Sequence, residues 1–173
     1  MTHPLEDGDQ LMPSSVRPVK IPHGVLEEVY KEARKAFPLE CCGWLVGTQG
    51  GREARSVRPC VNAAPQGAVG VVQGRSAETY YQFTPDDTIA LDKSLDTSTP
   101  AIAIYHSHPN GRAYFSRTDR EVARGPWGEG PAYPVQQLVV GISESQVHEA
   151  ALFAWSEEAK DFVEIARYNG ANI

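Results

Sequence analysis

The chain has 173 residues, of which 41% are hydrophobic and 22% charged, so we expect one globular domain with its own core. The 22 acidic residues outnumber the 16 lysines and arginines, which gives a formal net charge of −6. A negative field repels phosphate, so nucleic acid and anionic membrane surfaces are poor candidates as partners. No window approaches the roughly 20 apolar residues of a bilayer span, and we expect no membrane association.

The first 20 residues are polar and carry three prolines. We expect residues 1–20 to form a flexible leader and residues 21–173 to form the domain. The leader lacks the apolar core of a secretory signal, which predicts a cytoplasmic protein. The three cysteines agree with this, because an odd count with Cys41 and Cys42 adjacent is no disulfide framework. We interpret both adjacent cysteines as buried small hydrophobes.

Hydrophobic spacing predicts one mixed α/β domain in which helices alternate with strands. Apolar residues at helical spacing predict three helices, at residues 22–37, 86–94 and 116–124. Short apolar or alternating runs predict the strands, at residues 41–47, 53–62, 80–84, 101–105, 137–142, 147–155 and 162–168. In the second helix we expect Ile89 and Ala90 to face inward. Residues 63–78 show no regular period and predict a surface loop.

Two of the five histidines, His106 and His108, lie two residues apart at the end of the clearest buried strand. Alternate residues of a strand point to the same face, so both imidazoles are expected to project together. Pro109 and the following Asn110–Gly111 pair then stop the strand and turn the chain. Both side chains are thus expected beside a loop, where a site can open to solvent. A His-x-His pair alone is also compatible with two ordinary hydrogen-bonded histidines.

A helix start follows in the same stretch, with Ser116 as the N-cap and Asp119 on the first turn. The helix N-terminus keeps such a carboxylate ionised and ready to bind a cation. Two neutral imidazoles and one carboxylate form a ligand set suited to catalytic zinc, with a fourth position left for water. Zinc lowers the pKa of bound water to about 7 and polarises a carbonyl, so the pattern predicts hydrolysis of an amide-like bond. Ser-x-x-Asp alone is a common cap, and the metal hypothesis depends on the combination within fourteen residues.

The order His-Ser-His-Pro, six further residues and Ser-x-x-Asp resembles the JAMM motif of the MPN-positive metallopeptidases. The resemblance spans about residues 21 to 168. It implies a single mixed α/β domain of the MPN, cytidine-deaminase-like type, with a curved, mostly antiparallel sheet flanked by helices. It also implies that one Zn²⁺ per chain is bound by His106, His108 and Asp119. Ser116 would help to stabilise the oxyanion at the scissile carbonyl.

The resemblance further requires a glutamate general base near the start of the first buried strand, and Glu40 matches it. Glu40 lies between Leu39 and the apolar run, where an ionised carboxylate is costly without a partner. A partly buried glutamate has a raised pKa, which suits proton transfer near neutral pH. The residues alone favour an exposed carboxylate at a strand edge, so the catalytic role of Glu40 comes from the resemblance.

Members of this family cut peptide or isopeptide bonds after the C-terminal tails of ubiquitin-like proteins. The chain looks like the small stand-alone prokaryotic members, and residues 112–119 are similar to those that process ubiquitin-like sulfur-carrier proteins. The resemblance therefore implies a zinc peptidase acting after a Gly-Gly tail, with a sulfur-carrier protein as first candidate substrate. Such a tail can lie extended in a narrow groove. We expect that groove between residues 63–81 and 110–115. Tyr114 and Phe115 could line it, although the residues alone favour aromatic side chains that anchor the loop.

Three alternatives stay open at this point. A deconjugase of a ubiquitin-like modifier in a phage-defence system would carry the same motif. A non-catalytic MPN scaffold would bind partners only, although scaffold members usually lack part of the residue set that is complete here. A RadC-type hydrolase also contains His-x-His-Pro and Ser-x-x-Asp, but usually follows a helix-hairpin-helix region, which we do not find in this sequence. The oligomeric state and the identity of the carrier protein are unknown.

Overall fold

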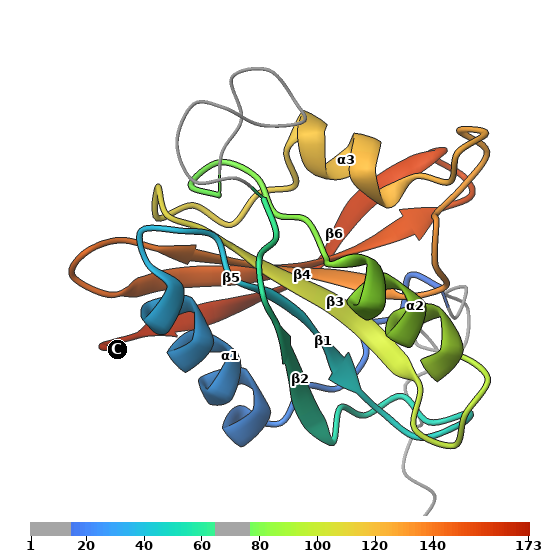
Figure 1. Ribbon diagram of the computed structural model, residues 1–173, viewed down its shortest axis with the longest axis horizontal. Coiled ribbons are helices and arrows are strands. Elements are labelled where there is room, and N and C mark those ends of the chain that lie inside the picture. Colours follow the sequence, from blue (N-terminus) through green and yellow to red (C-terminus); the bar gives the residue numbers. More distant parts are fainter. Residues whose placement is uncertain (1–14, 65–76) are drawn as a thin grey trace, which may run out of the picture.

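The computed structural model describes residues 15–64 and 77–173, which form a six-stranded sheet with helices on both faces (Figure 1). The strands are β1 (Cys42–Val46), β2 (Ser56–Cys60), β3 (Ala101–His108), β4 (Gln136–Ile142), β5 (Val147–Ser156) and β6 (Asp161–Ala171). The helices are α1 (His23–Ala36), α2 (Pro85–Ser94) and α3 (Arg117–Ala123). The expected mixed α/β fold is confirmed.

The sheet has the strand order β2-β1-β3-β4-β5-β6, so β3 and β4 lie at its centre. These two strands are parallel, whereas every other neighbouring pair is antiparallel. A parallel pair needs a crossover connection, and α3 lies within it. In the register of the sheet, His106 pairs with Cys42 of β1 on one side and with Val139 of β4 on the other. The sheet is therefore mostly antiparallel, as expected, with His106 at its middle.

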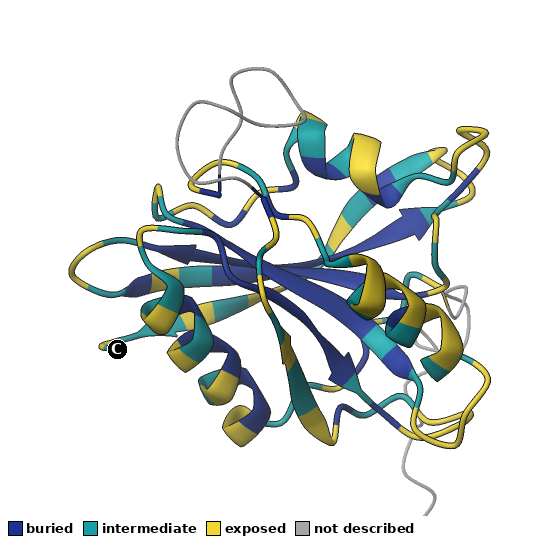
Figure 2. Ribbon diagram, in the orientation of Figure 1, coloured by how far each residue is buried: buried dark blue, intermediate teal, exposed yellow. Residues whose placement is uncertain are grey.

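The two faces of the sheet bury different cores. Ala103 and Tyr105 of β3 belong to the core under α1, whereas Ile104 belongs to a cluster that includes Leu91 of α2. Figure 2 shows the central strands buried and the outward side of α1 exposed. Because strand residues two positions apart share a face, His106 lies on the face of Ile104, opposite to α1.

Most of the predicted elements are confirmed within a few residues, and two expectations are wrong. The described residues 80–84 form no strand, because Gln82 pairs its backbone with Asn62 and Ala63 instead of with a neighbouring strand. Ala90 packs partly buried against the cluster that includes Leu91, as expected, but Ile89 is 53% exposed, and Leu91 is the buried residue of α2. Two positions along a helix correspond to about 200°, so α2 turns these side chains to opposite sides.

Residues 1–14 of the expected leader and residues 65–76 of the expected loop lie outside the described residues. Val19 is buried in the core under α1, and Lys20 forms a parallel bridge with Glu53. The domain boundary at residue 21 and the cytoplasmic location stay predictions.

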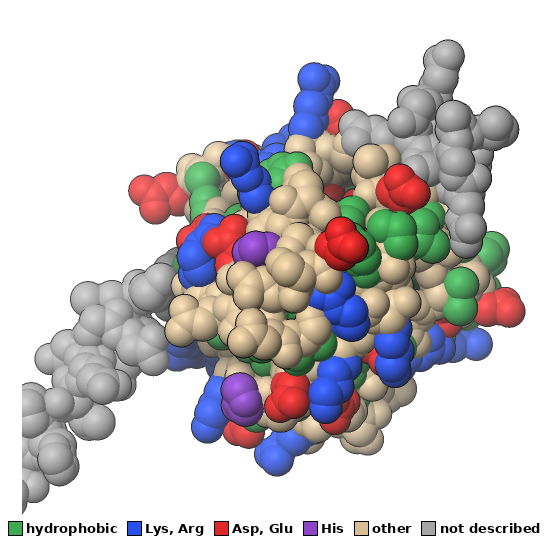
Figure 3. Space-filling model, turned by 90° about the vertical axis from the view of Figure 1, so that its left-hand side faces the viewer, with side chains coloured by type: hydrophobic (Ala, Val, Ile, Leu, Met, Phe, Trp, Pro, Cys, Tyr) green, Lys and Arg blue, Asp and Glu red, His purple; other side chains and the backbone are tan. Residues whose placement is uncertain are grey.

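The described part of the chain shows a mixed surface. In Figure 3, lysines and arginines are interspersed with aspartates and glutamates on the face that is shown. Within residues 15–64 and 77–173, none of the helices has the length and apolar character that a bilayer crossing requires.

Candidate functional site

β3 carries His106 and His108 on the sheet face opposite to α1, as the His-x-His spacing predicts. Both side chains are buried, and their Nε2 atoms lie 3.2 Å apart. β3 ends at His108, and Gly111, with a φ of 82°, takes part in the turn that follows. A Cβ at Gly141, the β4 partner of His108, would lie 2.6 Å from the backbone of Gly111. The close return of this loop over β4 therefore requires glycine at position 141.

α3 begins directly after this loop and brings Asp119 to both imidazoles. Its Oδ1 lies 3.1 Å from Nε2 of His106, and its Oδ2 lies 3.2 Å from Nε2 of His108. The Ser116 hydroxyl accepts a hydrogen bond from the Asp119 N–H at 3.0 Å, and Oδ2 of Asp119 accepts one from the Ser116 N–H at 2.9 Å. The predicted helix cap is confirmed, and it fixes the carboxylate that faces the imidazoles.

The protonation equilibria of these groups are coupled. Burial alone would raise the pKa of the Asp119 carboxyl, but the imidazoles of His106 and His108 hold it well below its usual range. Burial lowers the pKa of His108 and so favours the neutral imidazole that a metal binds. Burial also acts to lower the pKa of His106, yet the carboxylates of Asp119 and Glu40 outweigh it, and the pKa is raised. The site therefore holds an ionised carboxylate against two imidazoles.

The orientation of His108 is set by a main-chain carbonyl. Its Nδ1 lies 3.2 Å from the carbonyl oxygen of Arg112, in the loop between β3 and α3. A carbonyl only accepts, so this contact is a hydrogen bond when the proton is on Nδ1, which leaves the lone pair of Nε2 free for a metal. This is the tautomer that a metal ligand requires.

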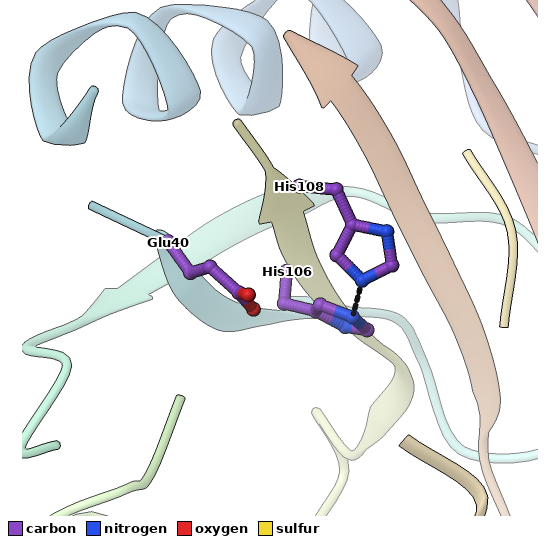
Figure 4. A group of neighbouring side chains, drawn as sticks. All are labelled: Glu40, His106 and His108. Atoms are coloured by element: carbon purple, nitrogen blue, oxygen red, sulfur yellow. Dashed lines mark hydrogen bonds between the residues drawn. The ribbon is translucent and has the colours of Figure 1, made fainter. Parts of the chain in front are cut away.

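Glu40 lies two residues before the start of β1, and its carboxylate points toward His106 (Figure 4). It is 3% exposed, and one ligand atom each of Glu40, His106 and His108 lies within 4.8 Å of the other two. β1 is the antiparallel neighbour of β3, with Cys42 opposite His106, so Glu40 reaches the histidines from the adjacent strand. The residues alone favoured an exposed carboxylate here, and that interpretation is wrong.

The main chain of Glu40 is held by residues that the sequence pattern did not single out. Its N–H donates to the carbonyl of Ala77 at 2.7 Å, and its carbonyl accepts from Nδ2 of Asn62 at 3.0 Å. The same amide donates to the Tyr80 carbonyl at 3.0 Å, while its oxygen accepts from the N–H of Gln82 at 3.1 Å. Asn62 thus joins Glu40 to the segment before α2. An asparagine after a strand ordinarily indicates a turn, so nothing in the sequence pointed to this role.

Two further residues support the histidines and Glu40. The ring of Tyr81 stacks on His106, with the ring centroids 4.7 Å apart and the planes 24° from parallel. Nδ1 of His106 is buried without a hydrogen-bond partner among the described residues, so the ring is held by this stack and by the contact of its Nε2 with Asp119. Ser107 accepts a hydrogen bond from the N–H of Cys41 at 2.8 Å and ties β3 to the residue after Glu40. Ser107 was not singled out from the sequence, although its position between the two histidines indicates that it lies at the site.

The two aromatic residues expected to line a substrate groove differ in exposure. Tyr114 is 46% exposed, and its ring centroid lies 4.7 Å from that of His108. Phe115 is 5% exposed and packs against Phe153 and Phe162. Phe115 therefore anchors the loop to the core, the interpretation that the residues alone favoured, and it does not line a groove. Tyr114 is placed where a chain bound at the histidines would touch it.

This cluster of buried side chains has the donors and spacing that a zinc ion takes. Tetrahedral zinc with ligands at roughly 2.0–2.1 Å separates neighbouring ligand atoms by about 3.3 Å. The contacts among the Nε2 atoms of His106 and His108 and the Asp119 carboxylate measure 3.1 to 3.2 Å. With Glu40 beside them, a buried group of imidazoles and carboxylates could hold one metal ion and carry out proton transfer next to it.

Comparison with known families finds one matching domain. The family model described as prokaryotic homologs of the JAB domain matches residues 22–157. The matched residues include every side chain of the cluster.

Curated relatives match a shorter part of the chain. A desampylase from Haloferax volcanii is 30% identical over 90 residues, which make up 51% of this chain and 58% of the relative. A CysO-cysteine peptidase from Mycobacterium bovis is 30% identical over 95 residues, or 54% of this chain and 58% of the relative. The chain thus covers well under two thirds of the length of either relative.

Two solved structures share the fold. A solution structure of a protein from Desulfitobacterium hafniense aligns with a TM-score of 0.60 at 21% identity, covering 84% of this chain and 88% of that one. A solution structure of a protein from Salinibacter ruber aligns with a TM-score of 0.53 at 20% identity, covering 84% and 87%.

Proposed function

This chain belongs to the family of prokaryotic homologues of the JAB domain, and we propose that it is a zinc-dependent peptidase acting on a ubiquitin-like protein. The bond cut is the one after a C-terminal Gly-Gly tail, with a sulfur-carrier protein as first candidate substrate. The observation that carries this proposal is the buried contact of one carboxylate, Asp119, with both His106 and His108, beside Glu40. The names of the relatives, a desampylase and a CysO-cysteine peptidase, support the substrate class.

We assign His106, His108 and Asp119 as the ligands of one zinc ion per chain. Asp119 is favoured over Glu40 as the carboxylate ligand because it contacts both Nε2 atoms, at 3.1 and 3.2 Å. When bound, zinc would polarise the scissile carbonyl and lower the pKa of water at the site to about 7. Glu40 is the remaining buried carboxylate and takes the role of general base.

Glu40 would move the proton that hydrolysis requires. Its carboxylate accepts a proton from the attacking water, whose oxygen joins the carbonyl carbon of the last glycine. The carbon–nitrogen bond then breaks, and Glu40 returns the proton to the nitrogen of the released residue or lysine side chain. The hydrogen bonds from Asn62 and to Ala77 fix the main chain of Glu40 and so the position of this carboxylate.

Ser116 would stabilise the oxyanion that forms at the scissile carbonyl. Its hydroxyl oxygen already accepts from the Asp119 N–H, but a hydroxyl also carries one donor proton. That proton is available to a developing negative charge next to Asp119. Donors of this kind contribute about 10²–10³-fold in rate.

The test is an intact-mass measurement on a ubiquitin-like carrier that ends in Gly-Gly followed by one further residue. We expect zinc-loaded protein to remove that residue, a chelator to stop the reaction and added zinc to restore it. A matched carrier with Gly-Ala in place of Gly-Gly should keep its mass. An unchanged mass of the Gly-Gly carrier would contradict the proposal. Cleavage that persists in the presence of the chelator would show that the reaction does not require zinc.

The same assay separates the alternatives. A carrier joined to a lysine side chain through its Gly-Gly tail presents an isopeptide bond in place of a peptide bond. Cleavage of this conjugate alone would favour a deconjugase over a carrier-processing peptidase. Binding of both carriers without any mass change would favour a non-catalytic scaffold.

A further inference from the structure

A pocket of about 280 Å³ lies beside the histidines on the same face of the sheet. Four aromatic residues, Tyr80, Tyr81, Phe83 and Tyr133, contribute to its walls, and Ile104 of β3 contributes as well. Tyr81 also stacks on His106, so one ring borders both the pocket and the metal centre. Ile104 precedes His106 by two residues on the same strand face, a separation of about 7 Å. The pocket therefore begins about two residues' length from His106, which is within reach of a large side chain next to the bond that is cut.

Gln137 lines this pocket, and its amide oxygen is buried without a partner among the described residues. Gln137 of β4 lies opposite Ile104, is 4% exposed, and its Oε1 has no hydrogen bond within residues 15–64 and 77–173. The neighbouring Gln136 is bonded: its Oε1 accepts from the N–H of Val19 at 3.0 Å, and its Nε2 donates to the Arg17 carbonyl at 2.8 Å. Burying an acceptor without a donor is unfavourable. Gln136 thus has a structural role, whereas the oxygen of Gln137 lacks the donor that a ligand could bring.

We propose that this pocket binds the side chain of the first residue after the scissile bond, and that this side chain is aromatic with a hydrogen-bond donor. Tyrosine and tryptophan are the residues of this class. The inference rests on the proposed function, because a Gly-Gly tail has no side chains. The first side chain near the cut bond then belongs to the released residue.

The chemistry of the pocket selects this class. Its volume suits one large side chain, and its aromatic walls suit a ring. The oxygen of Gln137 accepts from a phenol or an indole N–H. A lysine or arginine also donates, but no carboxylate lines the pocket among the described residues, so its charge would be buried without an anion.

The experiment compares two carriers that differ by one oxygen atom, one ending Gly-Gly-Tyr and the other Gly-Gly-Phe. We expect the protein to cut the tyrosine carrier with a kcat/KM at least about tenfold higher, because phenylalanine leaves the Gln137 oxygen unpaired. In Gln137→Met the ratio should fall to within about twofold of unity. Gln137→Met should fold at least as stably as the wild type, since it removes a buried unpartnered acceptor. Gln49→Met, the same change at an exposed turn residue, should keep the preference.

Failure of this inference is distinct from failure of the proposed function. Equal cleavage of both carriers by the wild type would overturn the pocket's role and leave the peptidase proposal standing. If neither carrier is cut, calorimetry with Gly-Gly-Tyr amide and Gly-Gly-Phe amide decides. Tighter binding of the tyrosine peptide to wild type, lost in Gln137→Met, supports the pocket, and equal affinities overturn it.

Discussion

The hydroxyl of Ser116 accepts a hydrogen bond from the N–H of Asp119, and the carboxylate of Asp119 accepts one from the N–H of Ser116, at 3.0 and 2.9 Å. The proposed oxyanion donor and the proposed metal ligand are therefore locked together at the start of α3. One oxygen of that carboxylate contacts His106 and the other contacts His108. A substitution at Ser116 therefore changes both the free energy of unfolding and the geometry of the proposed active site. The two effects have to be separated by experiment.

Two substitutions at Ser116 achieve this separation. Ser116→Ala should lower the free energy of unfolding by about 1 kcal/mol, whereas Ser116→Gly should cost only a few tenths, because glycine is tolerated at an N-cap. Both should lower kcat by about 10²–10³-fold, since both lack the hydroxyl donor. Urea unfolding and steady-state cleavage measure the two quantities. A wild-type kcat in Ser116→Gly would show that Ser116 only caps α3 and does not stabilise the oxyanion.

Asn62 should affect the rate without affecting the metal. Asn62→Asp replaces the amide donor by a carboxylate that repels the Glu40 carbonyl, so the general base shifts. We expect kcat to fall by about 10- to 100-fold, with KM and zinc content close to wild type. Asn172→Asp, the same change at an exposed residue, is the control. A wild-type kcat in Asn62→Asp would show that this hydrogen bond does not position Glu40.

Zinc should stabilise the folded protein through Asp119. A ligand that binds only the folded state adds about 2.7 kcal/mol at a hundredfold excess over its Kd, so added zinc should raise Tm. Asp119→Asn should lose most of this rise. Asp161→Asn is the matched control, because Asp161 pairs with Arg120 and Arg124 and not with the histidines. An equal rise in wild type and Asp119→Asn would show that Asp119 is no ligand.

The cysteine thiols should have no role in catalysis. Cys41 and Cys42 are buried, as expected, and burial raises the pKa of the Cys41 thiol to about 12. The thiolate is the reactive form, so almost none is present at pH 8. Iodoacetamide at pH 8 should leave cleavage unchanged, with mass spectrometry showing Cys41 unmodified. Loss of activity that tracks alkylation of Cys41 would contradict this.

Local rules were enough for the part of the site that is close together in sequence. Strand alternation places His106 and His108 on one face, and the helix cap orients Asp119, so periodicity and spacing predicted all three. Glu40 and Asn62 reach the site through strand pairing and loop contacts over long sequence separations, which no local pattern encodes. The role of Glu40 came from a family resemblance, and that of Asn62 was missed.

The errors have the same origin. Residues 80–84 have the composition of a strand, but their backbone pairs with Asn62 and Ala63, so tertiary contacts override propensity. Phe115 was only a candidate for the groove, and the contacts with Phe153 and Phe162 bury it as an anchor of the loop. The unpaired oxygen of Gln137 is a property of what surrounds it, which a sequence does not show.

The most direct test of the peptidase mechanism is the zinc-loaded Glu40→Gln protein. It is assayed beside the wild type on the Gly-Gly carrier, and cleavage is measured by intact mass. We expect about one zinc per chain in both proteins, because Glu40 is not a ligand in the proposed site. We expect the wild type to remove the residue after Gly-Gly and Glu40→Gln to leave the carrier intact. Cleavage by Glu40→Gln at the wild-type rate would contradict the proposed mechanism.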